Sequence, residues 1–260
     1  MRLSPYRIVG IATLVLAASS VVMASPSPSN AMDMTTPGMV TLVQGIPGKV
    51  INFYVNGSVI ASNVKYGSVV GPISEPPGIQ MASIRLAGSS PASPAIATIR
   101  TFVVSSANVI FQSDMTSTGA ATFTTILPPS VLPATKQHTW VEFWNGTSTA
   151  NIDIYGGPTS VPHPLVDTLP INNRSATPQP WCHNSCYDGG IDYAVGKYTF
   201  TPYASKSKTN PLMAARTINV QAGQIYLVDF LGSATSKPST AMSLVLQFAP
   251  TVSLSSLTAK

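Results

Sequence analysis

Residues 215–230 read ARTINVQAGQIYLVDF, two short apolar runs with a polar break between them. A related stretch, IRTFVVSSANVIFQSD, occupies residues 99–114 and aligns with the first without a gap. Arg100 then falls on Arg216, an offset of 116 residues. This match indicates that one module is used twice in the chain.

Further segments return in the same order. VINFYVNG at 50–57 has its counterpart in ANIDIYGG at 150–157. The Pro-rich stretch LPPSVLPATKQ at 127–137 separates the two series, because a central strand cannot hold so many prolines. The second copy carries about 15 extra residues between Tyr155 and Gly196, and these include PWCHNSCYDGG.

The segments themselves are typical of strands. They are short, rich in β-branched and aromatic residues, and bounded by Gly, Pro, Ser or Asn. Asn56-Gly57 between two apolar runs predicts a type I′ hairpin, because both residues tolerate positive φ. No segment after the N-terminal apolar stretch shows a long capped helical pattern. The sequence therefore predicts an all-β protein of two tandem immunoglobulin-like antiparallel β-sandwiches.

The N-terminus has the parts of a secretory signal peptide. Arg2 and Arg7 precede an uncharged segment, residues 8–24, that ends in small residues. Cleavage is expected after Ala24 or Ala31, and a retained membrane anchor is the alternative reading. If the signal peptide is cleaved, the chain contacts the membrane only through that peptide and only before cleavage.

The expected organisation follows from these boundaries. It is a signal peptide at 1–24, a flexible Pro/Ser/Met-rich leader at 25–38, a first sandwich at 39–128, a Pro-rich linker at 129–136, a second sandwich at 137–250 with the Cys-bearing insertion, and a C-terminal tail at 251–260.

Composition excludes some classes of function. Hydrophobic residues make up 44% of the 260 residues and charged residues 9%, which favours a folded core over disorder. The formal net charge of +5 falls to +3 without Arg2 and Arg7, because 12 basic residues then stand against 9 acidic ones. The remaining Lys and Arg residues are scattered, so a nucleic-acid partner is not expected.

Part of the chain resembles a known family. LVQGIPGKVINFYVNGSVIASNVKYGSV at 42–69 is similar to the opening of the secreted bacterial domain of unknown function 4397, with Val50 to Gly57 and Asn63 to Gly67 in the places of its motifs. VEFWNGTSTANIDIYGG at 141–157 resembles the same opening in a second copy. The resemblance covers nearly the whole mature chain. It implies a tandem, exported, sandwich-like protein and transfers no catalytic residue.

The residues offer little for catalysis. The chain lacks a G-x-S-x-G elbow, an HExxH motif and a Gly-rich phosphate loop, and its three His residues lie in or beside loop-like stretches. We therefore expect no enzyme, no catalytic residue and no cofactor.

CHNSC at 182–186 is the one dense cluster of reactive side chains. Two Cys in an exported chain predict a disulfide between Cys182 and Cys186. Free thiols are one alternative, and a zinc or copper site that adds His183 and His163 is another. The leader's Met32, Met34 and Met39 favour a solvated segment without a metal role, and a Cu(I) site is the alternative that their spacing allows.

The stretch WVEFW at 140–144 is the candidate ligand platform. In a strand, Trp140, Glu142 and Trp144 share one face. Two Trp on one face form a stacking surface for sugar rings if exposed, and part of a core if buried.

Together these features predict a non-catalytic envelope or extracellular protein, secreted to the periplasm or cell surface. It would act through protein–protein or surface contacts, as an adhesive or assembly subunit. A carbohydrate-binding module that uses Trp140 and Trp144 is the alternative, and a metal-binding periplasmic protein is the less favoured one. The expected partners are proteins or further copies of the chain, with glycans in the alternative.

Overall fold

The computed structural model describes residues 35–90, 92–128, 138–148, 151–156, 165–170, 186–187, 190–233 and 239–249. The signal peptide, residues 25–34 of the leader, the linker at 129–136 and the tail at 251–260 were predicted from sequence and lie outside these ranges. No helix in the described part of the chain has the length and apolar character to span a membrane.

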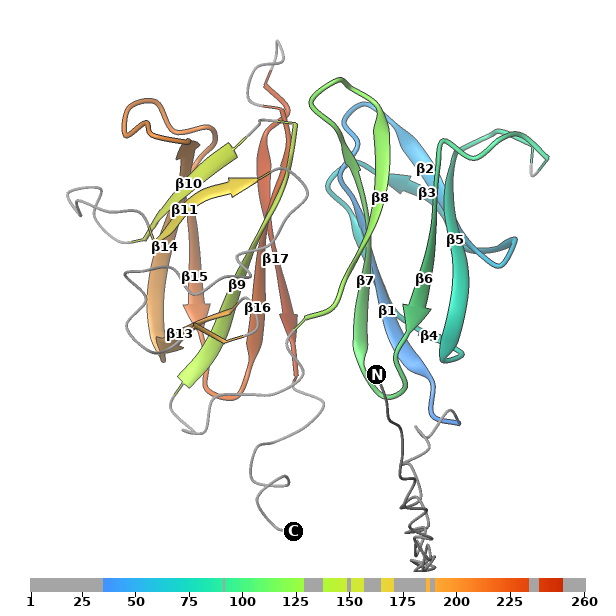
Figure 1. Cartoon of the computed structure of the whole chain (residues 1–260), viewed down its shortest axis with the longest axis horizontal. Helices are drawn as coiled ribbons and strands as arrows, with labels where there is room; N and C mark the ends of the chain where they lie inside the picture. The colour runs from blue at the N-terminus through green and yellow to red at the C-terminus, as the bar shows by residue number, and fades with distance from the viewer. Residues whose placement is uncertain are drawn as a thin grey trace, which may run out of the picture. The chain divides into compact units, whose positions relative to one another are not determined.

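The first sandwich contains eight strands in two four-stranded sheets (Figure 1). One sheet has the order β4-β1-β7-β8 and the other β3-β2-β5-β6. The strands are β1 (Gly38–Gln44), β2 (Val50–Val55), β3 (Ser58–Lys65), β4 (Val69–Glu75), β5 (Gly78–Leu86), β6 (Ala97–Val103), β7 (Asn108–Met115) and β8 (Ala121–Ile126).

The second sandwich repeats this arrangement with a five-stranded sheet, β12-β13-β9-β16-β17, and a four-stranded one, β11-β10-β14-β15. Its strands are β9 (His138–Thr147), β10 (Asn151–Gly156), β11 (Val166–Pro170), β12 (Cys186–Tyr187), β13 (Gly190–Ala194), β14 (Gly196–Ala204), β15 (Arg216–Val220), β16 (Ile225–Gly232) and β17 (Met242–Phe248). The short β12 lies in the insertion that the sequence located between Tyr155 and Gly196.

The prediction of an all-β fold with tandem sandwiches is confirmed. Every strand pair is antiparallel except one in each sandwich, where β1 pairs with β7 and β9 with β16 in parallel. The same exception in both copies supports the duplication. The predicted hairpin is also present, since β2 and β3 are joined by Asn56 at φ 49° and Gly57 at φ 82°.

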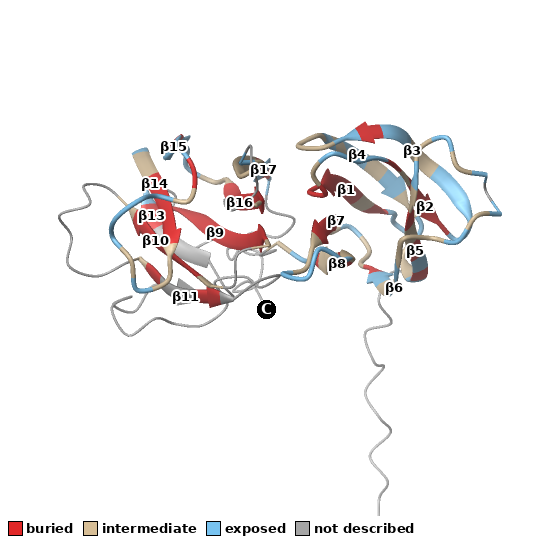
Figure 2. Ribbon diagram, turned by 90° about the horizontal axis from the view of Figure 1, so that it is seen from above, coloured by how far each residue is buried: buried red, intermediate tan, exposed pale blue. Residues whose placement is uncertain are grey.

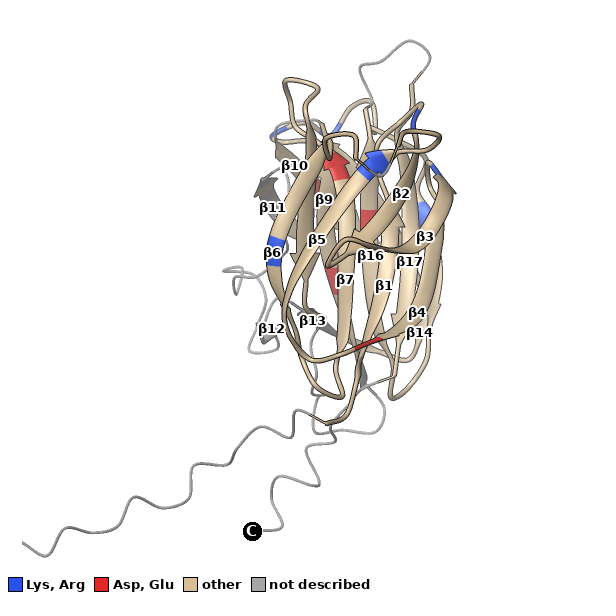
Figure 3. Ribbon diagram, turned by 90° about the vertical axis from the view of Figure 1, so that its right-hand side faces the viewer, with Lys and Arg blue, Asp and Glu red and all other residues tan. Residues whose placement is uncertain are grey.

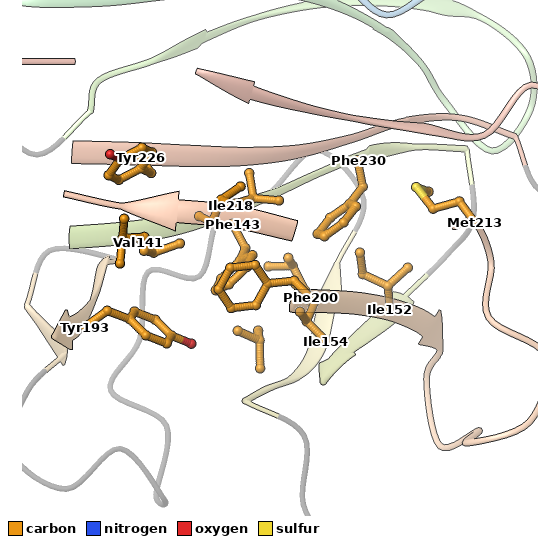
Figure 4. Packing of buried hydrophobic residues seen from close by; sticks show 14 residues of the cluster. Val141, Phe143, Ile152, Ile154, Tyr193, Phe200, Met213, Ile218, Tyr226 and Phe230 are labelled. Carbon is orange, nitrogen blue, oxygen red and sulfur yellow. The ribbon is translucent and has the colours of Figure 1, made fainter. Parts of the chain in front are cut away.

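Each sandwich has its own apolar core between its two sheets. In the first, Phe123 makes edge and tilted contacts with Phe111 and Phe53 at ring-centroid distances of 6.0 and 5.8 Å. In the second, Phe143 packs edge-on against Phe200 at 4.9 Å and stacks with Phe230, as Figure 4 shows. Successive side chains of a strand point to opposite faces, so every second one is directed into this core.

The register of the duplication differs by one residue from the gapless alignment. The β5–β6 ladder pairs Gly78 with Val103, and the β14–β15 ladder pairs Gly196 with Val220. Val103 therefore corresponds to Val220, an offset of 117, whereas the gapless alignment placed Val104 there. A slip of one residue moves every side chain of a strand to the opposite face. The predicted offset of 116 residues is therefore wrong, because it would place core-facing residues of one copy on outward-facing residues of the other.

Candidate functional site

The three residues of the candidate platform lie on β9, on the face directed away from the core of the second sandwich. The structure buries all of them: Trp140 is 5% exposed, Trp144 4% and Glu142 0%. Figure 2 shows β9 and its neighbour β16 as almost entirely buried strands. The two indoles therefore have no exposed face on which a sugar ring could stack, and the platform hypothesis does not fit this geometry.

A third apolar cluster covers these side chains, and it is shared between the two sandwiches. The sheet β4-β1-β7-β8 of the first sandwich packs here against the sheet β12-β13-β9-β16-β17 of the second. The two sandwiches lie accordingly in one compact unit, Asp33–Lys260. The buried members of the cluster are Val43, Ile110, Ile126, Trp140, Trp144, Ile225, Leu227, Leu231, Leu246 and Phe248. We call this contact the sheet interface.

Equivalent positions of the two copies meet at the sheet interface. The parallel ladders pair Gln112 with Val43 and Asp229 with Trp144, so Gln112 and Asp229 are counterparts. These two residues are hydrogen-bonded to each other across the interface, from Gln112 Nε2 to Asp229 Oδ1 at 3.1 Å. The contact therefore resembles the self-complementary interface of a two-fold symmetric dimer, built within one chain.

A polar cluster lies inside this otherwise apolar contact. Gln112 Nε2 also donates to both carboxylate oxygens of Asp114, at 3.2 and 3.0 Å. Gln112, Asp114 and Asp229 are all fully buried. Among the described residues, Gln112 Oε1 and Asp229 Oδ2 have no hydrogen-bond partner. One amide group thus serves two carboxyl groups that come from different sandwiches.

Burial dominates the electrostatics of the two carboxyl groups. It raises the pKa of Asp114 to about 7, while the hydrogen bond from Gln112 opposes the shift. The indole N–H of Trp144 also favours charged Asp114, although it lies outside ordinary hydrogen-bond geometry. Burial and, second, the charge of Asp114 raise the pKa of Asp229 well above its usual range. Both groups therefore hold protons more tightly than exposed aspartates do.

Two glycines, one from each copy, make room for the polar cluster. A methyl carbon built at Gly146 would lie 2.6 Å from Asp114 Oδ1 and 2.7 Å from Gln112 Nε2. One built at Gly45 would lie 2.4 Å from the same oxygen of Asp114. The glycine that ends each of the two equivalent stretches, VTLVQG and VEFWNG, is thus in direct contact with the cluster.

The outer sheets differ between the copies. On β5 and β6 of the first sandwich, Ile79, Met81 and Phe102 are 59%, 50% and 38% exposed. Ile79 lies directly opposite Phe102 in the ladder, and Met81 follows two residues after Ile79 on the same face. We call these three residues the apolar row.

The second sandwich has polar residues at the positions of the apolar row. Its ladder pairs Lys197 with Asn219 where the first sandwich pairs Ile79 with Phe102, and Thr199 takes the place of Met81. Lys197 and Asn219 are exposed. The apolar row is therefore a property of one copy and not a requirement of the shared fold. Figure 3 shows how few Lys, Arg, Asp and Glu residues the described strands carry in all.

Most of the other candidate residues lie outside the part of the chain that the structure describes. Cys182, His163, His183, Met32 and Met34 lie outside the described residues, and Met39 is in β1. Cys186 is placed only through the backbone of β12, so the disulfide stays a prediction. The described residues include no group of three or more His, Cys, Asp or Glu side chains arranged to hold a metal ion.

Sequence reasoning missed Gln112, Asp114 and Asp229. A signal for Asp229 existed, because it is the one charged residue within the apolar run IYLVDFLG. A charge inside a buried strand requires a partner. That the partner is Gln112, 117 residues earlier in the chain, could not be seen without the packing of the two sandwiches.

Comparison with known proteins adds little. No protein-family model and no curated protein matches the chain. Among solved structures, the chain is similar to family 41 carbohydrate-binding modules from streptococcal virulence factors, described as recognising α-glucan, and to an α-glucan-binding streptococcal virulence factor. Each match has 8% sequence identity, a TM-score of 0.23, and covers 76% of this chain and 94% of the other. Likeness at this level assigns neither fold nor ligand.

Proposed function

We propose that this chain is a non-catalytic, exported protein that works through contacts with other proteins, at the cell envelope or outside it, as an adhesive or assembly subunit. The N-terminal apolar segment after Arg2 and Arg7 supports export. The resemblance to the secreted domain of unknown function 4397 fits the same proposal and stays a prediction.

The apolar row is the observation that carries the proposal. Contiguous exposed apolar side chains cost free energy in water and commonly mark contact surfaces. Here the fold itself does not need them, since the second sandwich has Lys197, Thr199 and Asn219 at the same positions. A difference of this kind between two copies of one module supports the proposal that the outer sheet of the first copy meets a partner.

The acidic side chains of the sheet interface are poorly placed for catalysis. Asp114, Asp229 and Glu142 are fully buried between the sandwiches, where a substrate cannot reach them. The same burial argues against the sugar-binding alternative through Trp140 and Trp144. For that alternative we expect a glycan array and sugar quenching of Trp fluorescence to give no signal.

The test compares two triple variants of the mature protein. Ile79→Ser/Met81→Ser/Phe102→Ser removes the apolar row, and Lys197→Ser/Thr199→Ser/Asn219→Ser is the matched control on the second sandwich. Binding to whole cells of the producing organism and self-association by sedimentation velocity are measured for both variants and the wild type.

We expect the wild type and the control to bind cells or to self-associate. The apolar-row variant should do so at least tenfold more weakly, because each buried apolar anchor contributes about 1 kcal/mol or more to such contacts. Equal behaviour of the two variants would remove the apolar row as a contact surface. Turnover of an ester, glycoside or peptide by the pure protein would overturn the non-catalytic proposal.

A further inference from the structure

The carboxyl groups of Asp114 and Asp229 lie on different sandwiches and share the amide group of one residue, Gln112. Asp114 belongs to β7 of the first sandwich and Asp229 to β16 of the second. Two carboxylates so close repel each other strongly when both are charged and water is excluded. The closed sheet interface therefore needs something that compensates their charge.

No fixed positive charge is available for this purpose on the facing sheets. None of the nine strands in these two sheets contains a Lys or Arg. Gln112 donates to both carboxyl groups, yet Asp229 Oδ2 has no partner among the described residues. A proton on the pair would reduce the negative charge without breaking the contact.

Among the side chains that the structure describes, two other titratable groups face the sheet interface from the strands packed there. Glu142 extends from β9 between Trp140 and Trp144, and Tyr66 follows β3. Tyr66 donates to the backbone oxygen of Thr240 in the second sandwich, and burial raises the pKa of its hydroxyl group far above neutrality. Strands β1, β8 and β17 contain no charged residue, and β4 ends at Glu75. The side chains of His138 in β9 and Asp192 in β13 are outside those that the structure describes.

We propose that Asp114 and Asp229 form a proton-dependent latch between the two sandwiches. While the pair holds a proton, the two sheets stay closed on each other. When the pair becomes fully ionised, the two carboxylates repel and the sandwiches separate at the sheet interface, each keeping its own core. This proposal does not depend on the proposed contact function.

The direction of the pH dependence follows from the pKa shifts. An aspartate in the open form has a pKa of about 4, whereas burial raises the pKa of Asp114 in the closed form to about 7 and that of Asp229 well above its usual range. The closed form thus binds protons that the open form releases. Its advantage is fully present below about pH 4 and is lost as the pH rises through 7. Within this window the opening constant rises up to about tenfold per pH unit for each group.

Tryptophan accessibility reports the opening. Trp140 and Trp144 are buried in the sheet interface, and the third Trp of the chain, Trp181, is replaced by Phe to remove its background. Acrylamide quenching and the radius of gyration from small-angle scattering are measured between pH 4.5 and pH 9, with circular dichroism to confirm that the strands persist. We expect both quenching and radius to rise with pH while the β-sheet signal stays constant.

Four variants identify the groups that titrate. Asp114→Asn/Asp229→Asn cannot ionise and should remain closed over the whole range, and Asp229→Asn alone should shift the opening to higher pH or abolish it. Asp153→Asn is the matched control, because Asp153 is also buried, at 2% exposure, but lies on the outer sheet of the second sandwich. Its carboxylate accepts a hydrogen bond from the backbone N–H of Lys206 at 2.7 Å. Glu142→Gln should open as the wild type does.

Three results would overturn the latch. One is a folded wild type whose quenching and radius do not change with pH. Another is an unchanged transition in the double Asn variant. The third is a transition that disappears in Glu142→Gln, which would assign it to Glu142. The wild-type titration remains decisive even if a variant fails to fold at pH 5.

Discussion

Gly146→Ala is the most direct test of the close packing around the polar cluster. Gly146 lies in β9, outside the left-handed region, so alanine meets no backbone strain there. The added methyl carbon would lie 2.6 Å from Asp114 Oδ1, 2.7 Å from Gln112 Nε2 and 2.9 Å from Leu231 Cδ2. All three neighbours are themselves buried, so none can swing into solvent.

The expected loss of stability combines two effects. Overpacking of a dense interior costs about 1–3 kcal/mol. At pH 5 burial keeps both carboxyl groups protonated, so a hydrogen bond that is lost altogether costs about 0.5–1.5 kcal/mol, as between neutral groups. Because the cluster can relax in part, we expect Gly146→Ala to lower the free energy of unfolding by about 2–4 kcal/mol. Gly45→Ala should be at least as costly, because its methyl carbon would also meet the backbone oxygen of Ser113 at 2.5 Å.

Urea unfolding at pH 5, followed by circular dichroism, measures the effect, and Gly196→Ala is the matched control. Gly196 also lies in a strand, and the nearest atom to its added methyl carbon is Tyr198 Cε2 at 3.5 Å, an ordinary contact. The control should change stability by less than about 1 kcal/mol in either direction. If Gly146→Ala were as stable as Gly196→Ala, the close contact of Gly146 with Asp114 and Gln112 would be refuted.

Three further predictions follow from the fold. Gly57→Ala should lower the free energy of unfolding in urea by about 1–2 kcal/mol, because alanine is strained at the φ of 82° that Gly57 adopts. No atom lies within 4 Å of the added methyl carbon, so the loss comes from the backbone alone, and unchanged stability would contradict the type I′ turn. Limited proteolysis should cut within the Pro-rich stretch 127–137, and at pH 5 the two fragments should elute together from a sizing column, because they share the third apolar cluster; separate elution would argue against the sheet interface. Protein purified without reductant should show no thiols on alkylation and mass measurement, with the Cys182–Cys186 bond worth about 2 kcal/mol; two alkylated Cys would exclude the disulfide.

The sequence by itself determined the class of fold and its duplication. Both depend on patterns that are local in the chain: the short runs of β-branched and aromatic residues, the turn residues Asn56 and Gly57, and the recurrence of 99–114 in 215–230. Such patterns act within a few residues, so they can be read without knowing what the segment packs against. The sequence also placed Trp140, Glu142 and Trp144 on one face of a strand.

Only the tertiary structure decided what that face meets. Val103 corresponds to Val220, one residue away from the gapless match, because the choice between the two faces of a strand is made by the core and not by residue identity. Trp140 and Trp144 are buried because a second sheet packs on them, and an exposed platform has the same sequence pattern. The meeting of Asp114 with Asp229 through Gln112 joins residues more than a hundred positions apart. Burial and proximity of that kind, which set the pKa values of both carboxyl groups, arise only when the two sandwiches close on each other.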